Sequence, residues 1–153
     1  MTLDPLHHNH LTALLTGDLD AAARLRQQFR ADDHGTATEL LRAATAVTLE
    51  YRFGPGAGLG ASPIHHGRLA AFMSELRLAG RATLPPPDYL AVESVARALY
   101  GEPHLVQPLS DQRRTRAMYA VVDHELARYA WLRQHSGHLV DQARQRMTTW
   151  ILV

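Results

Sequence analysis

The sequence predicts an all-α protein, a single-domain bundle of five to seven helices with no sheet. Helix-forming residues dominate, because alanine and leucine number 23 each whereas valine numbers eight and isoleucine two. Apolar residues also recur at helical spacing in several segments. A chain of 153 residues and 17.0 kDa fits one domain that folds without disulfides. We therefore expect residues 1–153 to form one helical domain.

Residues 6–53 are expected to form an N-terminal helical hairpin. Leucines fall on one face of residues 6–15, which predicts a short first helix. The break at Gly17 precedes a second helix, for which Asp18 or Asp20 can serve as the N-cap because a carboxylate accepts hydrogen bonds from the free N–H groups of a first turn.

A longer helix is expected over residues 36–53, still within the hairpin. Thr36 and Glu39 stand three residues apart, which is the spacing of a capping box. Apolar positions then repeat at i, i+4, i+7 and i+8 from Leu40 to Tyr51, as in a helix with one buried face.

The segment 54–63 is expected to be a flexible loop, either a linker or a lid, between the hairpin and a C-terminal helical group over residues 64–153. Glycines alternate with other residues along this segment: Gly54, Gly56, Gly58 and Gly60. Such a pattern is typical of a loop. A dinucleotide-binding loop is not expected, because no β-strand pattern precedes the glycines.

Four helices are expected in the C-terminal group, each with a recognisable start. Ser62 and Pro63 fit the N-cap and first position of the first, Asp88 caps the second, and Ser110 or Asp111 caps the third. The expected ranges are 63–79, 88–100, 110–134 and from 138 onward, with a loop at 102–109.

Two absences from the composition limit the chemistry of this chain. It has no cysteine, which excludes disulfides, thiolate nucleophiles and cysteine-ligated metals. Its 16 basic residues are all arginine, so Schiff-base chemistry and the lysine-dependent phosphoryl-transfer motifs are excluded as well. No cofactor is predicted.

The charge balance argues against nucleic acid and anionic membranes as partners, because 16 arginines against 15 acidic residues leave a formal charge of +1. No run of 18 apolar residues could span a membrane, and the first residues lack the pattern of a signal peptide. We therefore expect a cytoplasmic protein. Abundant alanine with arginine in place of lysine indicates a GC-rich genome, such as that of an actinobacterium.

Two resemblances rest on short segments. Residues 16–25, Thr-Gly-Asp-Leu-Asp-Ala-Ala-Ala-Arg-Leu, resemble a helix start common in tetratricopeptide-type hairpins. No second copy follows about 34 residues later, so a repeat protein is not predicted. The segments Leu-Leu-Arg-Ala-Ala, Ala-Phe-Met-Ser-Glu-Leu-Arg and Val-Ala-Arg-Ala-Leu-Tyr-Gly resemble small all-helical actinobacterial proteins of unknown function. This resemblance implies no functional residue.

Three histidines, His7, His8 and His10, follow Asp4 closely. On a helix Asp4 would face His7 and His8, and such a set could bind a divalent cation. Because chain termini are usually poorly ordered, we expect these side chains to lie on a solvated arm.

The candidate catalytic residues are His65, His66, His124 and Glu125. His65 and His66 fall in the first turn of an expected helix, where the dipole favours the neutral imidazole that a base or a ligand requires. Glu125 falls at the edge of a buried helical face, where a buried hydrogen bond or a surface salt bridge, for example with Arg128, is the simpler structural role. Surface positions account equally for the histidines.

Asp123, His124, His138 and Asp141 are the candidate metal ligands. Carboxylates and imidazoles on facing helices build the metal sites of helical bundles. The Glu-x-x-His and His-Glu-x-x-His motifs of such sites are absent, so hydrogen bonds and salt bridges are the simpler interpretation.

Arg113, Arg114 and Arg116 form the one basic run, and they could contact phosphate. A solvated helix start is the favoured interpretation, because interleaved aromatic residues and a net positive charge are both missing.

Apolar residues near the C-terminus are candidates for an interface: Trp131, Trp150, Ile151, Leu152 and Val153. Aromatic anchors are enriched at interfaces, and catalytic signatures are absent. The sequence therefore favours a small cytoplasmic interaction or regulatory module without catalytic activity, which contacts a protein partner or a second copy of itself. The alternative is a small helical enzyme or small-molecule binder with a His/Asp/Glu site between helices.

Overall fold

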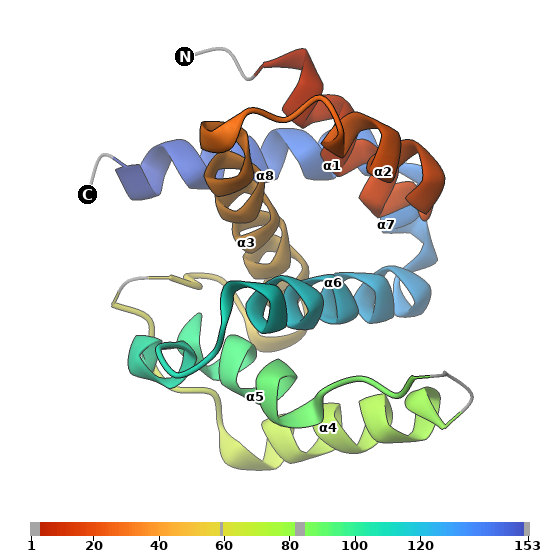
Figure 1. Cartoon of the computed structure of the whole chain (residues 1–153). Helices are drawn as coiled ribbons and strands as arrows, with labels where there is room; N and C mark the ends of the chain where they lie inside the picture. The colour runs from red at the N-terminus through yellow and green to blue at the C-terminus, as the bar shows by residue number, and fades with distance from the viewer. Residues whose placement is uncertain (1–3, 59, 82–84, 152–153) are drawn as a thin grey trace.

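The computed structural model describes residues 4–58, 60–81 and 85–151, and within these ranges it contains eight α-helices, one 3-10 turn and no sheet (Figure 1). The all-α prediction is confirmed, although the expected count of five to seven helices is one too low. No helix among the described residues is both long and apolar enough to cross a bilayer. The elements are α1 (Pro5–Thr16), α2 (Leu19–Arg26), α3 (Ala31–Phe53), α4 (His66–Gly80), α5 (Tyr89–Ala98), η1 (Pro103–Val106), α6 (Asp111–Arg128), α7 (Ala130–Gln134) and α8 (Ser136–Ile151).

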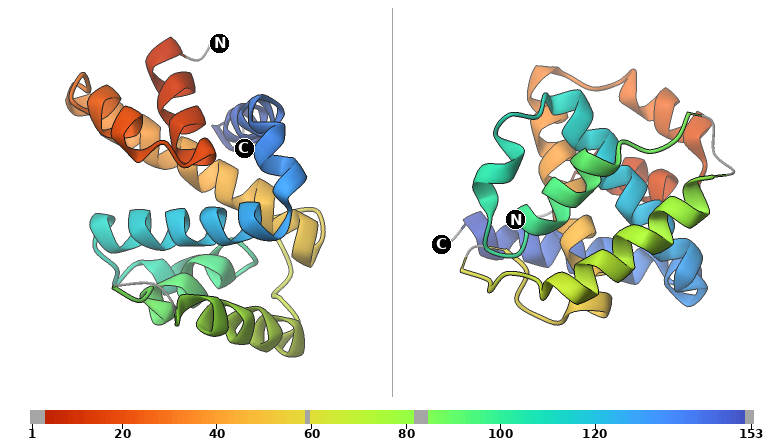
Figure 2. Two further views of the ribbon diagram at one scale, coloured as in Figure 1. Left: turned by 90° about the vertical axis from the view of Figure 1, so that its right-hand side faces the viewer. Right: turned by 90° about the horizontal axis from the view of Figure 1, so that it is seen from below.

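The longest helix, α3, is the centre of the bundle, and α1, α6 and α8 all pack against it (Figures 1 and 2). On the far side of α6 lies α5, and α4 forms the outermost layer beyond it. The last helix, α8, packs against both α1 and α3. Helices of the expected N-terminal hairpin and C-terminal group therefore share one core.

Small residues allow the close approach of helices to α3. Ala43, Ala44 and Ala46 are completely buried on it. The same core contains the largest fully buried side chains, among them Phe72, Leu11, Leu15, Leu40, Leu49 and Leu126. Each such side chain stabilises the fold by roughly 1.5–3 kcal/mol relative to an exposed position.

The start of α3 lies five residues before the expected one. Arg30 is the N-cap residue, and its backbone N–H donates to the carboxylate of Asp33 at 2.8 Å. Asp32 and Asp33 place negative charge in the first turn, where the helix dipole favours it. The predicted capping box at Thr36 was wrong, because the helix has already begun there.

Helix α4 begins three residues later than expected. His65 is its N-cap, and the Nδ1 atom of His65 accepts a hydrogen bond from the backbone N–H of Gly67 at 3.2 Å. The predicted start at Ser62 and Pro63 was wrong because the segment before His65 is held against the end of α5. There a Cβ atom on Gly101 would lie 2.4 Å from the carbonyl oxygen of Ala61.

The predicted helix over 110–134 is interrupted at Tyr129, where φ is −109° and ψ is 69°. The Tyr129 N–H still donates to the carbonyl of Glu125 at 2.8 Å, which completes α6. The short α7 then buries Leu132 and redirects the chain into α8. No glycine or proline marks this break, and α8, which follows it, packs against α3.

The glycine-rich segment 54–63 was expected to be flexible, but its described part is anchored. Gly58 donates its N–H to the carbonyl of Leu99 at 2.7 Å, and the hydroxyl of Tyr100 donates to the carbonyl of Gly54 at 2.8 Å. Ala57 is buried between these contacts. This part of the loop is therefore packed against the end of α5 and is not a free lid.

Candidate functional site

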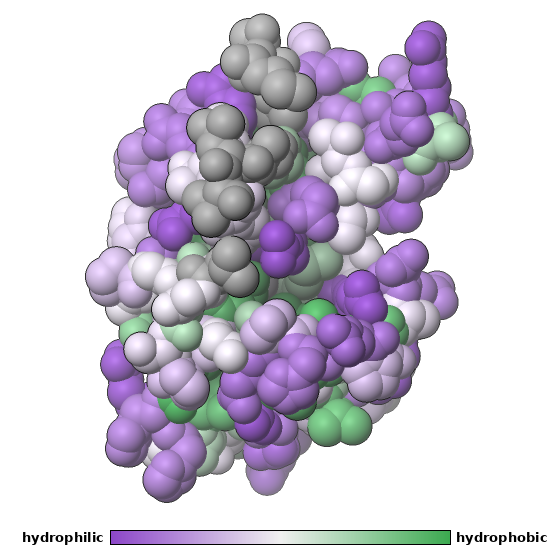
Figure 3. All heavy atoms as spheres, turned by 90° about the vertical axis from the view of Figure 1, so that its left-hand side faces the viewer, coloured by the Kyte–Doolittle hydropathy of each residue, from purple (hydrophilic) through white to green (hydrophobic). Residues whose placement is uncertain are grey.

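A groove of about 1390 Å³ separates two parts of the bundle. One wall comes from α1, α2 and the start of α3, and the other from the end of α5, η1 and the start of α6. The groove opens as the notch at the right of the space-filling view in Figure 3. We call it the arginine-rimmed groove.

Apolar side chains from both walls form the floor of the groove: Leu14, Phe29, Leu41, Val95, Leu99 and Met118. Most of this floor belongs to the core, since Leu41, Leu99 and Met118 are almost fully buried. The groove therefore offers an incoming molecule the outer surface of the hydrophobic core, on helices that are held rigidly by it.

Arginines form the rim of the groove: Arg26, Arg42, Arg114 and Arg116, against the two carboxylates of Glu39 and Asp111. Arg42 pairs with Glu39 at 3.2 Å, and Arg114 donates to the carbonyl of Val106 at 2.9 Å. Within the described ranges, the guanidinium groups of Arg26 and Arg116 have no hydrogen-bond or ion-pair partner. These two guanidinium groups are available to an anion.

Histidine rings surround Phe29 at one end of the groove. The ring centroids of His7, His10 and His34 lie 5.4, 4.9 and 5.2 Å from that of Phe29. His7 is buried and its Nε2 lies 3.0 Å from Oδ1 of Asp33. The predicted solvated arm was therefore wrong. The Phe29 ring contacts the rings of all three histidines, and the Asp33 carboxylate is hydrogen-bonded to His7.

His10 is a buried polar residue of the groove with an unpaired ring nitrogen. It is 6% exposed, and its Nε2 is buried without a hydrogen-bond partner among the described residues. Burial, and after it the charges of Arg26 and His7, together lower the pKa of His10 to about 4. At neutral pH His10 is therefore an uncharged imidazole with free hydrogen-bonding capacity beside an unpaired arginine.

Asp4 caps α1 instead of facing the histidines. Its carboxylate accepts a hydrogen bond from the backbone N–H of Leu6 at 2.9 Å, and Pro5 occupies the first helical position. The alternative considered from sequence, in which Asp4 joins His7 and His8 as cation ligands, is therefore not the arrangement in the structure.

A second polar cluster, the Arg52 network, joins α3, α4 and α6. Nη2 of Arg52 lies 2.7 Å from Oε1 of Glu125, and Nη1 lies 3.0 Å from Oε2 of Glu75. His124 and Arg128 each contact Oε1 of Glu75 at 3.0 Å. Glu125 is completely buried, rather than at the edge of the core. Its predicted pairing with Arg128 was wrong, because Arg128 contacts Glu75.

The Arg52 network is internally satisfied. Burial opposes the charge of Arg52, but hydrogen bonds to Glu75 and Glu125 outweigh it and raise the pKa of Arg52. Hydrogen bonds from Arg52 lower the pKa of Glu75 to about 2, against the opposing effect of burial. A carboxylate with so low a pKa is a poor proton acceptor. The network therefore connects three helices through charged groups that are paired with one another.

The candidate catalytic residues fall into two places. His124 and Glu125 are both in the Arg52 network, whereas His65 and His66 lie at the exposed start of α4 with stacked rings 5.2 Å apart. Sequence reasoning missed Arg52. The pattern that could have indicated Arg52 is its position on α3, where it follows Thr45 and Thr48 at helical spacing along the buried face.

The four candidate metal ligands do not come together: Asp123, His124, His138 and Asp141. Asp123 pairs with Arg133 at 3.1 Å, and Asp141 lies 3.7 Å from Arg144 on its own helix. In the part of the chain that the structure describes, no three histidine, aspartate or glutamate side chains are placed to hold a metal ion.

The basic run at the start of α6 is divided among three roles. Arg113 pairs with Asp88 at 2.9 Å, and Arg114 is bonded to the carbonyl of Val106. Arg116 is exposed on the rim of the groove. Only Arg116 of the three is free to bind an anion.

The candidate interface residues also separate. Trp131 is 48% exposed, and its ring centroid lies 5.4 Å from that of Tyr51 in an edge-to-face arrangement. Trp150 is partly buried, with the guanidinium of Arg42 at 4.4 Å from its ring centre. Leu152 and Val153 lie outside the described residues, and only the backbone of Ile151 is described.

No significant match to this chain was found among protein-family models, curated proteins or solved structures. The chain is a small all-helical protein over its described residues, and no family or homologue is identified. Its function is therefore inferred from the geometry of the groove and the pockets.

Proposed function

We propose that this protein is an interaction module, and that its arginine-rimmed groove binds an acidic amphipathic helix of a protein partner. The observation that carries the proposal is the combination of an apolar floor with two unpaired arginines, Arg26 and Arg116, on opposite walls. Amphipathic helices commonly bind in such grooves through apolar residues at i, i+3, i+4 and i+7.

The size of the groove supports a helix as its occupant. A ten-residue helix is about 15 Å long and about 10 Å across, and it therefore fills about 1200 Å³. The groove has a volume of about 1390 Å³. Pockets for small molecules usually measure roughly 300–1000 Å³, so the groove is larger than a small-molecule site requires.

The charge of the rim supports an acidic occupant. Four arginines face two carboxylates there, so the groove carries a local excess of positive charge although the whole chain has a formal charge of only +1. Carboxylates that flank the apolar face of a partner helix would pair with Arg26 and Arg116. Charge complementarity of this kind sets the orientation and specificity of a partner.

A non-catalytic role agrees with the state of the charged groups. The carboxylates nearest to a histidine, Glu75 and Asp33, are held in hydrogen bonds with protein groups. The alternative of a small helical enzyme that uses His124 and Glu125 has less support, because both belong to the Arg52 network. The cytoplasmic location and actinobacterial origin remain predictions from sequence.

The proposal is tested with a synthetic probe, a fluorescein-labelled helical peptide of 16 residues with leucines on one face and glutamates beside them. Fluorescence anisotropy measures its binding to the full chain. We expect saturable binding that the double variant Arg26→Glu, Arg116→Glu weakens at least about tenfold, which corresponds to about 1.4 kcal/mol.

The matched control is the double variant Arg24→Glu, Arg81→Glu, which makes the same change in net charge at exposed residues outside the groove. It should bind the peptide within about twofold of the wild type. The proposal is wrong if the control weakens binding equally, if a lysine-for-glutamate version of the peptide binds as tightly, or if neither peptide binds.

A further inference from the structure

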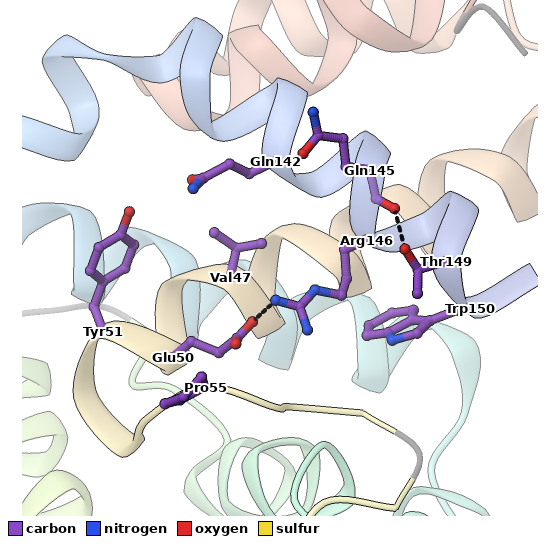
Figure 4. A pocket seen from close by; sticks show the side chains of 9 residues that line it. All are labelled: Val47, Glu50, Tyr51, Pro55, Gln142, Gln145, Arg146, Thr149 and Trp150. Carbon is purple, nitrogen blue, oxygen red and sulfur yellow. Dashed lines mark hydrogen bonds and ion pairs between the residues drawn. The ribbon is translucent and has the colours of Figure 1, made fainter. Parts of the chain in front are cut away.

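A second pocket, of about 510 Å³, lies between α3, α8 and the start of the glycine-rich loop (Figure 4). Tyr51 and Trp150 stand at its two ends, Val47 forms its floor, and Pro55 closes the loop side. We call it the Trp150 pocket. Its volume falls in the range of roughly 300–1000 Å³ that is usual for small-molecule sites.

The walls of the Trp150 pocket are fixed before any ligand arrives. The guanidinium of Arg42 lies 4.4 Å from the centre of the Trp150 ring. At the ring edge, a Cβ atom on Gly58 would lie 2.7 Å from Nε1 of Trp150, so the loop backbone directly contacts the indole. A rigid aromatic wall binds a flat ligand without the entropic cost of ordering the wall.

The charges inside the pocket neutralise each other. Glu50 and Arg146 form an ion pair across it (Figure 4). Glu50 also accepts a hydrogen bond from the backbone N–H of Gly56 at 2.9 Å, and Arg146 lies 3.4 Å from the carbonyl of Ala57. Because both charges are already paired, the pocket favours an uncharged ligand over an ion.

Gln142 supplies hydrogen-bonding capacity that the protein does not use. Its Oε1 atom is buried and has no partner among the described residues. Its side chain extends over Val47 toward Tyr51 (Figure 4). A buried polar atom without a partner is unfavourable, and a primary amide offers one donor and one acceptor side by side.

We infer that the Trp150 pocket binds an uncharged, planar heteroaromatic ligand with an amide or lactam edge, a class that includes free nucleobases and nicotinamide. The flat face of the ligand would pack against the aromatic walls, and its donor–acceptor edge would pair with the Gln142 amide. This inference does not depend on peptide binding in the arginine-rimmed groove, since the lining residues of the two sites are different.

Saturation-transfer difference NMR tests the inference, because it detects weak ligands on the intact chain. The probes are uracil, with a ring lactam, and nicotinamide, with an exocyclic amide. Benzoate is the control ligand, since it resembles nicotinamide in size and shape but carries a negative charge. We expect saturable binding of at least one probe, and at least tenfold weaker binding of benzoate.

Two pairs of variants locate the binding. Thr149→Phe places a ring at the mouth of the pocket and should abolish binding, whereas Thr148→Phe, at the adjacent exposed residue outside the pocket, should not. The pair is matched because both hydroxyls donate to a carbonyl four residues earlier, at 3.0 Å. Gln142→Met should weaken binding about fivefold or more, and the surface variant Gln134→Met should leave it unchanged.

The inference is overturned if neither probe binds, if benzoate binds as well as nicotinamide, or if Thr148→Phe and Thr149→Phe have the same effect. Circular dichroism melting curves equal to that of the wild type are required for every variant, so that loss of binding is not loss of fold. If Thr149→Phe does not fold, Gln142→Met against Gln134→Met decides the question.

Discussion

The Arg52 network and the arginine-rimmed groove share two helices, α3 and α6, and differ in how their charges are used. In the network, Arg52 makes hydrogen bonds to two carboxylates, one of which is completely buried. In the groove, the side chains of Arg26 and Arg116 have no hydrogen-bond or ion-pair partner within the described ranges. The charges of the network are thus paired within the protein, whereas two arginines of the groove are available to bind a partner.

The difference follows from where each charge meets water. A buried charge must be paired, because water no longer stabilises it. A charge on the rim of a groove is stabilised by water and can exchange that water for a ligand. Arginines that stabilise the fold are therefore buried and paired, whereas arginines that can bind a partner are exposed and unpaired.

The largest effect is expected from Glu125→Ala, which removes the buried partner of Arg52. We expect the free energy of unfolding to fall by about 3 kcal/mol, because a buried guanidinium loses a carboxylate. Urea denaturation followed by circular dichroism measures the change.

The double variant Arg52→Met, Glu125→Leu is the control for Glu125→Ala. It removes both charges and should recover most of the loss, since apolar replacement of a buried ion pair is often neutral or stabilising. A loss below about 1 kcal/mol for Glu125→Ala would show that the network contributes little to stability.

An intermediate effect is expected from His10 as the pH falls. Its pKa is lowered to about 4 in the folded protein by burial first, and then by Arg26 and His7, whereas the unfolded value is near 6.5. Between these values the unfolded chain binds more protons, so stability is full above about pH 6.5 and decreases as the pH falls toward about 4. We expect His10 to account for about 2 kcal/mol of this decrease.

Urea denaturation at pH 7 and at pH 4.5 tests this assignment. His10→Gln should show a smaller loss of stability between the two pH values than the wild type. His8→Gln is the matched control and should behave like the wild type. Equal acid sensitivity of the wild type and His10→Gln would contradict the role of His10.

The smallest effect on stability is expected from Arg26→Glu. Because Arg26 has no partner to lose, the free energy of unfolding should change by less than about 0.5 kcal/mol, as is usual for surface substitutions. The same denaturation experiment measures it. A loss above about 1 kcal/mol would mean that Arg26 holds the fold, and the contrast with Arg52 would no longer hold.

The sequence by itself determined the helical class and several helix starts. Asp18, Asp88 and Ser110 were each expected as possible N-caps, and each accepts a hydrogen bond from a backbone N–H three residues later, at 3.0, 3.1 and 3.2 Å. Such caps depend on neighbours within one helical turn, so local sequence is enough to predict them.

The tertiary structure alone decided the break at Tyr129, the burial of His10 and the pairing of Arg52 with Glu125, which lie 73 residues apart. The groove also depends on the tertiary structure, because its lining residues range along the sequence from His10 to Tyr119. Local spacing describes one helix face at a time, but a groove or a buried ion pair depends on which faces meet. That is settled by the packing of distant helices around α3, where burial makes an unpaired charge unfavourable and leaves Arg26 and Arg116 free only at the rim.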